Sequence, residues 1–346
     1  TVLTHRAPEL VPEVQVLQRG DLGHGIEKVE AGLPAFLGSV PVIEPAGGHT
    51  IPQARKTLAL WLSRPDHPLT ARVLVNRVWA WHFGRGIVST PSDFGRQGQA
   101  PSHAELLDWL ATEFTSGGWS IKSLHRLILL SNTYQMTSRS ANAEAMRKDP
   151  ENRLLWRMNR RRLEAESLWD SIHTVAGTLN LKMGGRPVVP PLGKDEMDGL
   201  ASKWQWPVSA DPQEQNRRGI YILVRRNFPF PMFEVFDAPD TAASCPRRDV
   251  TNVPTQALWM LNNRAAFEQA RAFAEKLLGT YGPDPRRFVA EAWVRALGRR
   301  PSIGEVREAL ELVSRLADQH PGEPASEALT KLCLALFNLN EFSYVD

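Results

Sequence analysis

Residues 70–137 read TARVLVNRVWAWHFGRGIVSTPSDFGRQGQAPSHAELLDWLATEFTSGGWSIKSLHRLILLSNTYQMT. Apolar residues in this stretch recur at intervals of three and four, which predicts amphipathic helices. Thr70 is placed to cap the first helix. Ser102 and Glu105 have the spacing of a capping box for the second, and Ser120 is placed to cap the third. The stretch therefore predicts three helices in close succession, separated by glycine-rich connections.

The same signals predict helices over much of the remaining chain. Ser302 and Glu305 have the spacing of a second capping box. Helices are expected from Ile51 to before Pro65, from about Arg160 to Gly177, from Pro254 through Ala270, and at 285–297, 303–317 and 325–339. Strands are expected at Val14–Leu17 and Ile220–Val224, and Pro231–Phe236 is expected to be extended or helical. The fold is therefore predicted to be mainly α, a multi-helix globular assembly with a few short β-strands and long irregular loops.

The length of the chain favours two lobes, because a single core stops growing at roughly 250–300 residues and this chain has 346. Composition changes along the chain suggest a finer division. We expect an irregular wrapping segment at 1–50, a central helical lobe at 51–180, a loop- and strand-containing insert at 181–250, and a C-terminal helical lobe at 251–346.

The formal net charge is only +3, which argues against a dedicated nucleic-acid-binding protein. The arginines are nevertheless clustered at Arg157–Arg162, Arg217–Arg226 and Arg247–Arg248. Such clusters either pair with carboxylates at the surface or form a pocket for an anionic or hydroxyl-rich ligand. The sequence leaves both interpretations open.

The cysteines and histidines give no metal or haem pattern. Cys245 and Cys333 are far apart and lack a CxxC or CxxCH context, so we expect neither a zinc ribbon nor a c-type haem in this chain. Whether the two cysteines pair is undecided at this stage. His82, His103 and His125 match no metal-binding spacing, and we interpret them as structural.

No apolar run approaches the ~20 residues that a membrane-spanning helix needs. The chain begins at Thr1 without a methionine. We therefore expect a processed product or a piece of a longer protein.

Several long motifs resemble, in the same order, the domain of unknown function (DUF) 1553. They are the 61–114 stretch beginning WLSRPDHPLTARVLVNRVWAW, GWSIKSLHRLILLSNTY, RRLEAE, NRRGIYILVRRNFPFPMFEVFDAPD, RRDVTNVPTQALWMLN and FNLNEFSYVD. The resemblance implies a planctomycete domain of large secreted proteins, downstream of a cytochrome-like domain and a companion domain. It implies a periplasmic or cell-surface location, with any haem in an associated domain, and it implies no established activity. One departure is Trp169, where the family pattern leads us to expect Arg before Asp170.

Arg72, Asn76 and Trp79 are spaced to share one face of the first helix, with Arg77 offset. An aromatic ring beside fork-like hydrogen-bond donors suits a sugar, so these three residues are candidate ligand-binding residues. In the alternative interpretation, the arginine and asparagine are buried and tie neighbouring loops together.

Asp93, Glu164 and Asp237 are the candidate catalytic carboxylates. Asp93 follows Ser in a glycine-rich loop, where Asp is also a common turn residue. Glu164 with Asp170 or Asp237 could form the two-carboxylate arrangement of a glycosidase. Pairing of Arg162 with Glu166 along the chain offers a structural explanation of the same charges.

Arg218, Arg225 and Arg248 are further candidate ligand-binding residues. Arginine pairs that include Arg218 and Arg225 flank the predicted strand, and Arg248 lies in the loop that leads into the predicted helix at Pro254. A helix N-terminus attracts anions through its free N–H groups and its dipole. A buried network of salt bridges would produce the same composition.

The leading hypothesis is a non-haem accessory or scaffold module of an exported cytochrome-linked system, with a possible polysaccharide ligand and with the cytochrome-like and companion domains as partners. The first alternative is a carbohydrate-active enzyme, hydrolytic or oxidative, that uses the Asp and Glu candidates with arginine. A nucleic-acid-binding module is the second alternative, and it would need the arginine clusters on one continuous face.

Overall fold

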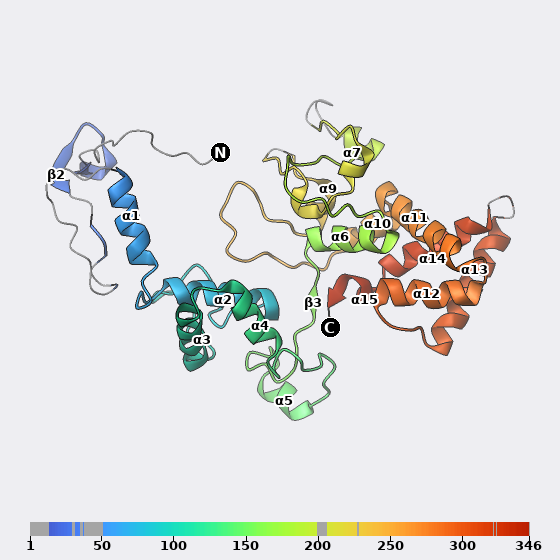
Figure 1. The fold of residues 1–346 in the computed structure, drawn as a ribbon, viewed down its shortest axis with the longest axis horizontal. Helices are drawn as coiled ribbons and strands as arrows, with labels where there is room; N and C mark the ends of the chain where they lie inside the picture. The colour runs from blue at the N-terminus through green and yellow to red at the C-terminus, as the bar shows by residue number, and fades with distance from the viewer. Residues whose placement is uncertain are drawn as a thin grey trace. The chain divides into compact units, whose positions relative to one another are not determined.

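The computed structural model describes residues 14–29, 32–34, 37, 51–198, 206–226, 228–320, 322 and 324–345, and Figure 1 shows its elements. The chain forms two compact units, unit 1 at Thr1–Asn159 and unit 2 at Arg160–Asp346. The described residues are mainly helical with short antiparallel strands, so the expected fold class is confirmed. The finer division into four segments stays a prediction, and most of its 1–50 segment lies outside the described residues.

Unit 1 consists of a hairpin followed by helices. Strand β1 (Val14–Leu17) pairs antiparallel with β2 (Gly25–Val29) across the short helix η1 (Gln18–Gly20). The helices are α1 (Ile51–Leu62), α2 (Thr70–Phe83), α3 (Ala104–Ser116), α4 (Ile121–Leu129) and α5 (Ala143–Lys148). Helices α2, α3 and α4 pack together around a core that includes Val75, Val78, Leu110, Phe114 and Ile128.

Glycine and serine fix the ends of these helices much as the sequence indicates. Gly84 ends α2 with φ 79°, a left-handed conformation that glycine adopts without strain. The Ser120 hydroxyl accepts a hydrogen bond from the Ser123 N–H and caps α4. The predicted cap at Thr70 is wrong, because Thr70 lies inside α2 and its hydroxyl contacts His67 Nδ1.

The predicted capping box of Ser102 and Glu105 is also wrong. His103 occupies the N-cap position of α3. The Ser102 hydroxyl turns instead to the Ile87 carbonyl and to His103 Nδ1. A tertiary contact with the chain that follows α2 therefore replaces the local cap.

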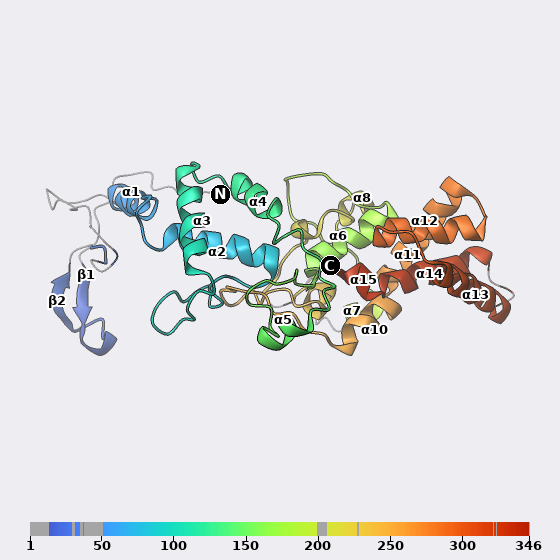
Figure 2. The same ribbon diagram turned by 90° about the horizontal axis from the view of Figure 1, so that it is seen from below.

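Unit 2 begins and ends in a two-stranded ladder, β3 (Arg161–Arg162) with β4 (Tyr344–Val345). Between them lie α6 (Ala165–Ala176), α7 (Lys194–Asp198), α8 (Pro212–Gln215), η4 (Gly219–Tyr221), α9 (Pro231–Val235), α10 (Pro254–Asn262), α11 (Arg264–Tyr281), α12 (Pro285–Leu297), α13 (Ile303–Gln319), α14 (Ala325–Phe337) and α15 (Asn340–Ser343). Helices α11 and α14 lie side by side in Figure 2, and α6 packs on α11. Phe273, Leu277, Phe288, Cys333 and Phe337 are fully buried in this core.

Helices α12 and α13 confirm their predictions, and the capping box of Ser302 and Glu305 is present. The single helix expected from Pro254 through Ala270 is wrong. Asn263 has an extended backbone, and its side chain caps α11 by accepting from the Ala265 N–H at 2.8 Å. Because Asn competes for backbone groups, it breaks the run into α10 and α11.

The strand expected at Ile220–Val224 is wrong as well. The chain makes the 3₁₀ turn η4, and only Ile222 forms a bridge, to Val188. Gly219 lies so close to α6 that a Cβ there would stand 2.8 Å from the Glu166 Cα. Asp170 accepts from the Gly219 N–H at 2.6 Å, which anchors the turn instead of a ladder.

Both cysteines are free: Cys245 is exposed and Cys333 is buried. Among the described helices, none has the length and apolar character required to cross a bilayer.

Candidate functional site

A groove of about 400 Å³ opens on unit 1 between the start of α2, the loop at 89–101 and the start of α3. Its volume lies within the range of small-molecule sites. The lining is mainly apolar, with a few polar groups: Leu69, Arg72, Val88, Phe94, Gly95, Gly98, Gln99, Ala100, Pro101, Ala104, Leu107 and Asp108. We call it the Arg72 groove.

An ion pair lies in the wall of the Arg72 groove. Arg72 Nε donates to Asp108 Oδ1 at 2.7 Å, and Arg72 Nη1 donates to the Pro68 carbonyl at 2.9 Å. Both side chains are partly exposed, at 36% for Arg72 and 59% for Asp108. The guanidinium is thus held in one orientation from α2 while it remains accessible to a ligand.

Asp93 shapes the loop of the groove from within. Its Oδ1 accepts from the Gly95 N–H at 2.8 Å, and its carbonyl accepts from the Thr90 hydroxyl at 2.8 Å. A Cβ at Gly98 would overlap the Asp93 carbonyl oxygen, so the loop closes only with glycine there. These contacts agree with the turn-forming interpretation of Asp93.

Asn76 holds one lining residue of the groove, Val88, in place. Its buried side chain donates to the Val88 carbonyl at 2.9 Å and accepts from the Val88 N–H at 2.8 Å. This pairing ties the segment after α2 back onto the helix, and Val88 itself lines the groove. Asn76 therefore has a supporting role, as the structural alternative predicts.

Trp79 lies in the core of unit 1 and not in the Arg72 groove. It is only 7% exposed, and its ring stacks on Phe83 with centroids 4.3 Å apart. The aromatic side chain of the groove is Phe94, which the sequence reasoning did not select. The one sequence feature that could have indicated Phe94 as a groove residue is its position directly after Asp93 in the turn.

The candidate residues of unit 2 are held in ion pairs around the start of α6. Arg248 forms two hydrogen bonds to the Glu166 carboxylate, at 2.5 and 3.0 Å, and lies 3.4 Å from Glu164 Oε2. The hydrogen bonds to Glu166 raise the pKa of Arg248, although partial burial opposes this shift. Glu166 is the principal partner of Arg248. The predicted pairing of Glu166 with Arg162 is wrong, because Arg162 is bonded to Asp237.

Asp237 holds two segments together. It accepts from Arg162 Nη2 at 2.6 Å and from the N–H of Thr251 at 2.9 Å. Burial raises the pKa of Asp237, but the hydrogen bonds from Thr251 and Arg162 outweigh it, and the net pKa is lowered. The backbone of Asp237 has φ 61°, so these bonds also hold a conformation that is unusual for a residue other than glycine.

Arg218 and Arg225 lie on either side of the short bridge at Ile222. Arg218 Nε donates to Asp170 Oδ2 at 2.9 Å, and Arg225 is partly buried further along the segment. In unit 2, Glu164 and Arg248 therefore share one cluster with Glu166, whereas Asp237 pairs with Arg162 and Arg218 pairs with Asp170. Arg72, Asn76 and Asp93 belong to unit 1.

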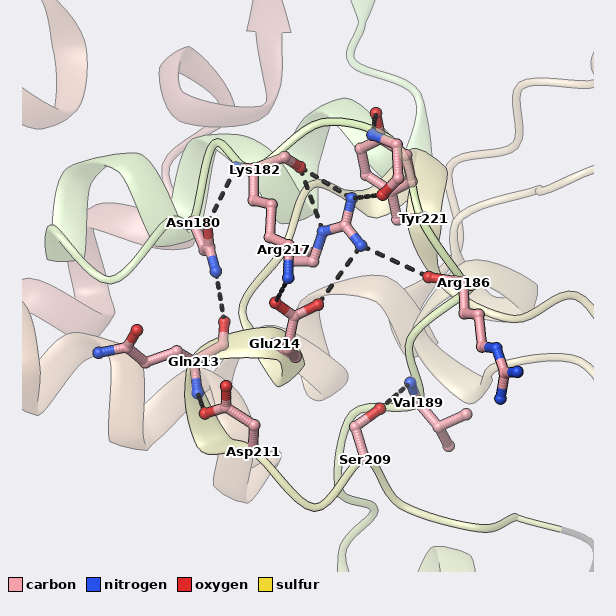
Figure 3. A network of polar contacts seen from close by, with 11 residues as sticks. Asn180, Lys182, Arg186, Val189, Ser209, Asp211, Gln213, Glu214, Arg217 and Tyr221 are labelled. Atoms are coloured by element: carbon pink, nitrogen blue, oxygen red, sulfur yellow. Dashed lines mark hydrogen bonds and ion pairs between the residues drawn. The ribbon is translucent and has the colours of Figure 1, made fainter.

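Arg217 is a key structural residue that the sequence reasoning passed over in favour of Arg218. Figure 3 shows its buried guanidinium surrounded by backbone carbonyls and by Glu214. Nη2 donates to the carbonyls of Gly184 and Lys182 at 2.6 and 2.8 Å, and the group lies over the Tyr221 ring at 3.9 Å. No pattern in the sequence separates two adjacent arginines into one buried and one exposed.

Of the three candidate histidines, two contact each other and the third lies apart from them. His82 Nε2 and His125 Nδ1 are 2.7 Å apart, whereas His103 contacts Ser102. Within the described residues, no three His, Cys, Asp or Glu side chains are grouped to hold a metal ion.

These observations define a mainly helical protein of two units, with a surface groove in unit 1 and paired charges in unit 2. A family model described as a protein of unknown function (DUF1553), PSD1, matches residues 54–313. The match covers most of the chain, and the chain therefore belongs to this family. No curated protein and no solved structure shows a significant match.

Proposed function

We propose that the chain is a non-catalytic accessory module that binds a hydroxylated ligand, such as a glycan, in the Arg72 groove. The single observation that carries this proposal is the groove itself. It combines an apolar wall, a phenylalanine ring and an oriented arginine–aspartate pair in about 400 Å³.

The surroundings of the candidate carboxylates favour binding over catalysis. Asp93 holds the turn of its own loop, and Asp237 is bonded to Arg162 and Thr251. A general base or nucleophile needs an oxygen that can reach a substrate. Both carboxylate oxygens of Asp237 and Oδ1 of Asp93 accept structural bonds. Glu164 is 55% exposed and lies 3.4 Å from Arg248, but its expected partners Asp170 and Asp237 are paired with Arg218 and Arg162. The geometry therefore gives no specific support to the carbohydrate-active enzyme.

The arginine clusters do not favour nucleic-acid binding either. Arg162 and Arg217 are buried. Arg218 and Arg248 are bonded to carboxylates of α6. Phosphate binding of a whole strand needs several cations free on one face.

The remaining parts of the proposal rest on the family resemblance. We propose that the module is exported to the periplasm or cell surface and works beside cytochrome-like and companion domains. Any haem would belong to those domains, because this chain contains no CxxCH sequence.

Affinity electrophoresis of the purified chain in gels containing soluble polysaccharides tests the proposal. We expect retarded migration in at least one polysaccharide, restored to the free mobility by Arg72→Ala but not by Arg77→Ala, an exposed arginine of the same helix outside the groove. A reducing-end assay on the same polysaccharides should detect no cleavage. Uniform mobility in all gels, or release of reducing ends, would overturn the proposal.

A further inference from the structure

We infer that the Arg72 groove selects an uncharged saccharide over an acidic one; this inference rests on the proposed function. The lining contains one cation, Arg72, and one anion, Asp108, and these are bonded to each other. The lining of the groove therefore carries no net charge. Recognition of a uronate or a sulfate normally uses arginine free of a competing carboxylate.

An acidic ligand would meet two obstacles in this groove. Its carboxylate would compete with Asp108 for the guanidinium, and it would lie close to the negative charge of Asp108. Like charges repel, and because the Asp108 side chain is 59% exposed, water and salt weaken this repulsion but do not reverse its sign. The neighbouring charged residues Arg96 and Glu105 are of opposite sign and do not line the groove.

A neutral sugar fits the hydrogen-bonding groups that the ion pair leaves. Arg72 uses Nε and Nη1, and Asp108 uses Oδ1. Within the described part of the chain, nothing bonds to Arg72 Nη2 or to Asp108 Oδ2. A donor and an acceptor therefore remain on adjacent side chains, which matches a pair of neighbouring hydroxyl groups, since each hydroxyl both donates and accepts.

The apolar part of the lining suits the C–H face of a pyranose ring. Phe94, Leu69, Val88 and Leu107 all contribute to it. The loop that carries Phe94 is already held by the bonds of Asp93 and Thr90, so binding would not have to order it.

Calorimetric titration with matched oligosaccharides tests the inference. The neutral probes are hexasaccharides of glucose, mannose and xylose, and the acidic probes are a hexagalacturonate and a sulfated galactan hexasaccharide. We expect at least one neutral probe to bind about tenfold or more tightly than either acidic probe. Raising the salt concentration should leave the neutral affinity unchanged, because no net charge is neutralised.

Two substitutions separate charge from shape. Asp108→Asn keeps the size of the side chain but leaves Arg72 unpaired, so it should shift the preference toward acidic probes by about tenfold. Phe94→Ala should weaken neutral binding about tenfold, whereas Trp109→Ala, an exposed aromatic of α3 outside the groove, should leave it unchanged.

The outcomes distinguish the inference from the proposed function. Tighter binding of an acidic probe by the unaltered chain would overturn the neutral selectivity. An unchanged preference in Asp108→Asn would overturn the assignment of that selectivity to the ion pair. Either result would leave the binding function standing. Failure of both classes to bind, in a chain whose helical circular dichroism is intact, would overturn both.

Discussion

Arg217 organises a segment that has little regular structure of its own. Its guanidinium bonds the carbonyls of residues 182, 184 and 186, and it lies on the ring of Tyr221 (Figure 3). The planar group has five donors in a fixed fork, which an ammonium cannot reproduce. The path of the chain between α6 and α8 therefore depends on this one side chain.

Arg217→Lys should lower the free energy of unfolding by about 3 kcal/mol, because buried carbonyls and Glu214 would lose charged donors. Arg218→Lys is the matched control. Its side chain is 45% exposed and holds one ion pair, so it should cost under about 1 kcal/mol. Urea unfolding of both variants measures the difference, and equal losses would contradict the structural role of Arg217.

His173 is a buried residue whose protonation opposes folding. It is 3% exposed, stacks on Trp169 and donates from Nδ1 to the Trp169 carbonyl. Burial lowers the pKa of His173 from 6.5 to about 4, and the hydrogen bond and Asp170 offset only part of this shift.

Because the pKa of His173 is lowered in the folded state, its protonation does not reduce the free energy of unfolding above pH 6.5. The unfolded chain takes up a proton near pH 6.5, whereas the folded chain does so only near pH 4. The stability contribution should fall by roughly 3 kcal/mol as the pH drops through that window. Urea unfolding at several pH values, compared with His173→Gln, measures it. A variant with the same pH slope would show that another group is responsible.

At the scale of elements, the loop at 89–101 forms one side of the Arg72 groove, so the proposed ligand binding would depend on it. Gly98 should be irreplaceable there, because a Cβ would overlap the Asp93 carbonyl and lie 2.9 Å from the Thr90 hydroxyl. We expect Gly98→Ala to open the loop and to weaken binding in the Arg72 groove about tenfold or more.

The control for this prediction is Gly279→Ala, in α11. Apart from its chain neighbours and the backbone of its own helix, no atom of the described residues lies within 4 Å of a Cβ at Gly279. The substitution should therefore stabilise unit 2 by about 0.5–1 kcal/mol and leave ligand binding unchanged. Calorimetric titration and urea unfolding give both readouts, and unaltered binding by Gly98→Ala would contradict the role of the loop.

The helices were predictable where the residues that start and end a helix agree with the periodicity of the apolar residues. Helix α12 begins after Asp284, at Pro285, and ends before Gly298. The predicted start of α13 is correct, and its predicted end differs from the observed end by two residues. Prediction failed where a side chain had two possible uses. Asn263 ends α10 and caps the start of α11. The Ser102 hydroxyl donates to the Ile87 carbonyl and does not cap α3.

The candidate site was only partly predictable. The sequence pointed to Arg72, Asn76 and Asp93, and all three lie in or beside the groove. It could not show that Asp108 is 36 positions away yet bonded to Arg72, nor that Trp79 points into the core. Such facts depend on how α2 packs on α3, which local spacing does not encode.

At the scale of the whole molecule, each unit has its own hydrophobic core. The buried residues of the cluster around α2, α3 and α4 all lie between positions 71 and 158. Those of the larger cluster all lie between positions 165 and 342. No described buried residue belongs to both. Each unit therefore has what a domain needs in order to fold alone.

Residues 1–159 and 160–346, expressed separately, should each give helical circular dichroism and a cooperative urea transition. Intrinsic tryptophan fluorescence follows unfolding in both, because Trp79 lies in one core and Trp293 in the other. A fragment that binds hydrophobic dyes and unfolds without a transition would show that the cores depend on each other.

The ladder of β3 and β4 sets how unit 2 would respond to mechanical force. Arg161 pairs with Val345, so the chain enters and leaves the unit at the same end of two antiparallel strands. Tension applied to those two ends runs across the ladder and parts its hydrogen bonds one pair at a time. Unit 2 should thus unzip from its termini at low force, and the packed helices behind the ladder would bear the tension only afterwards.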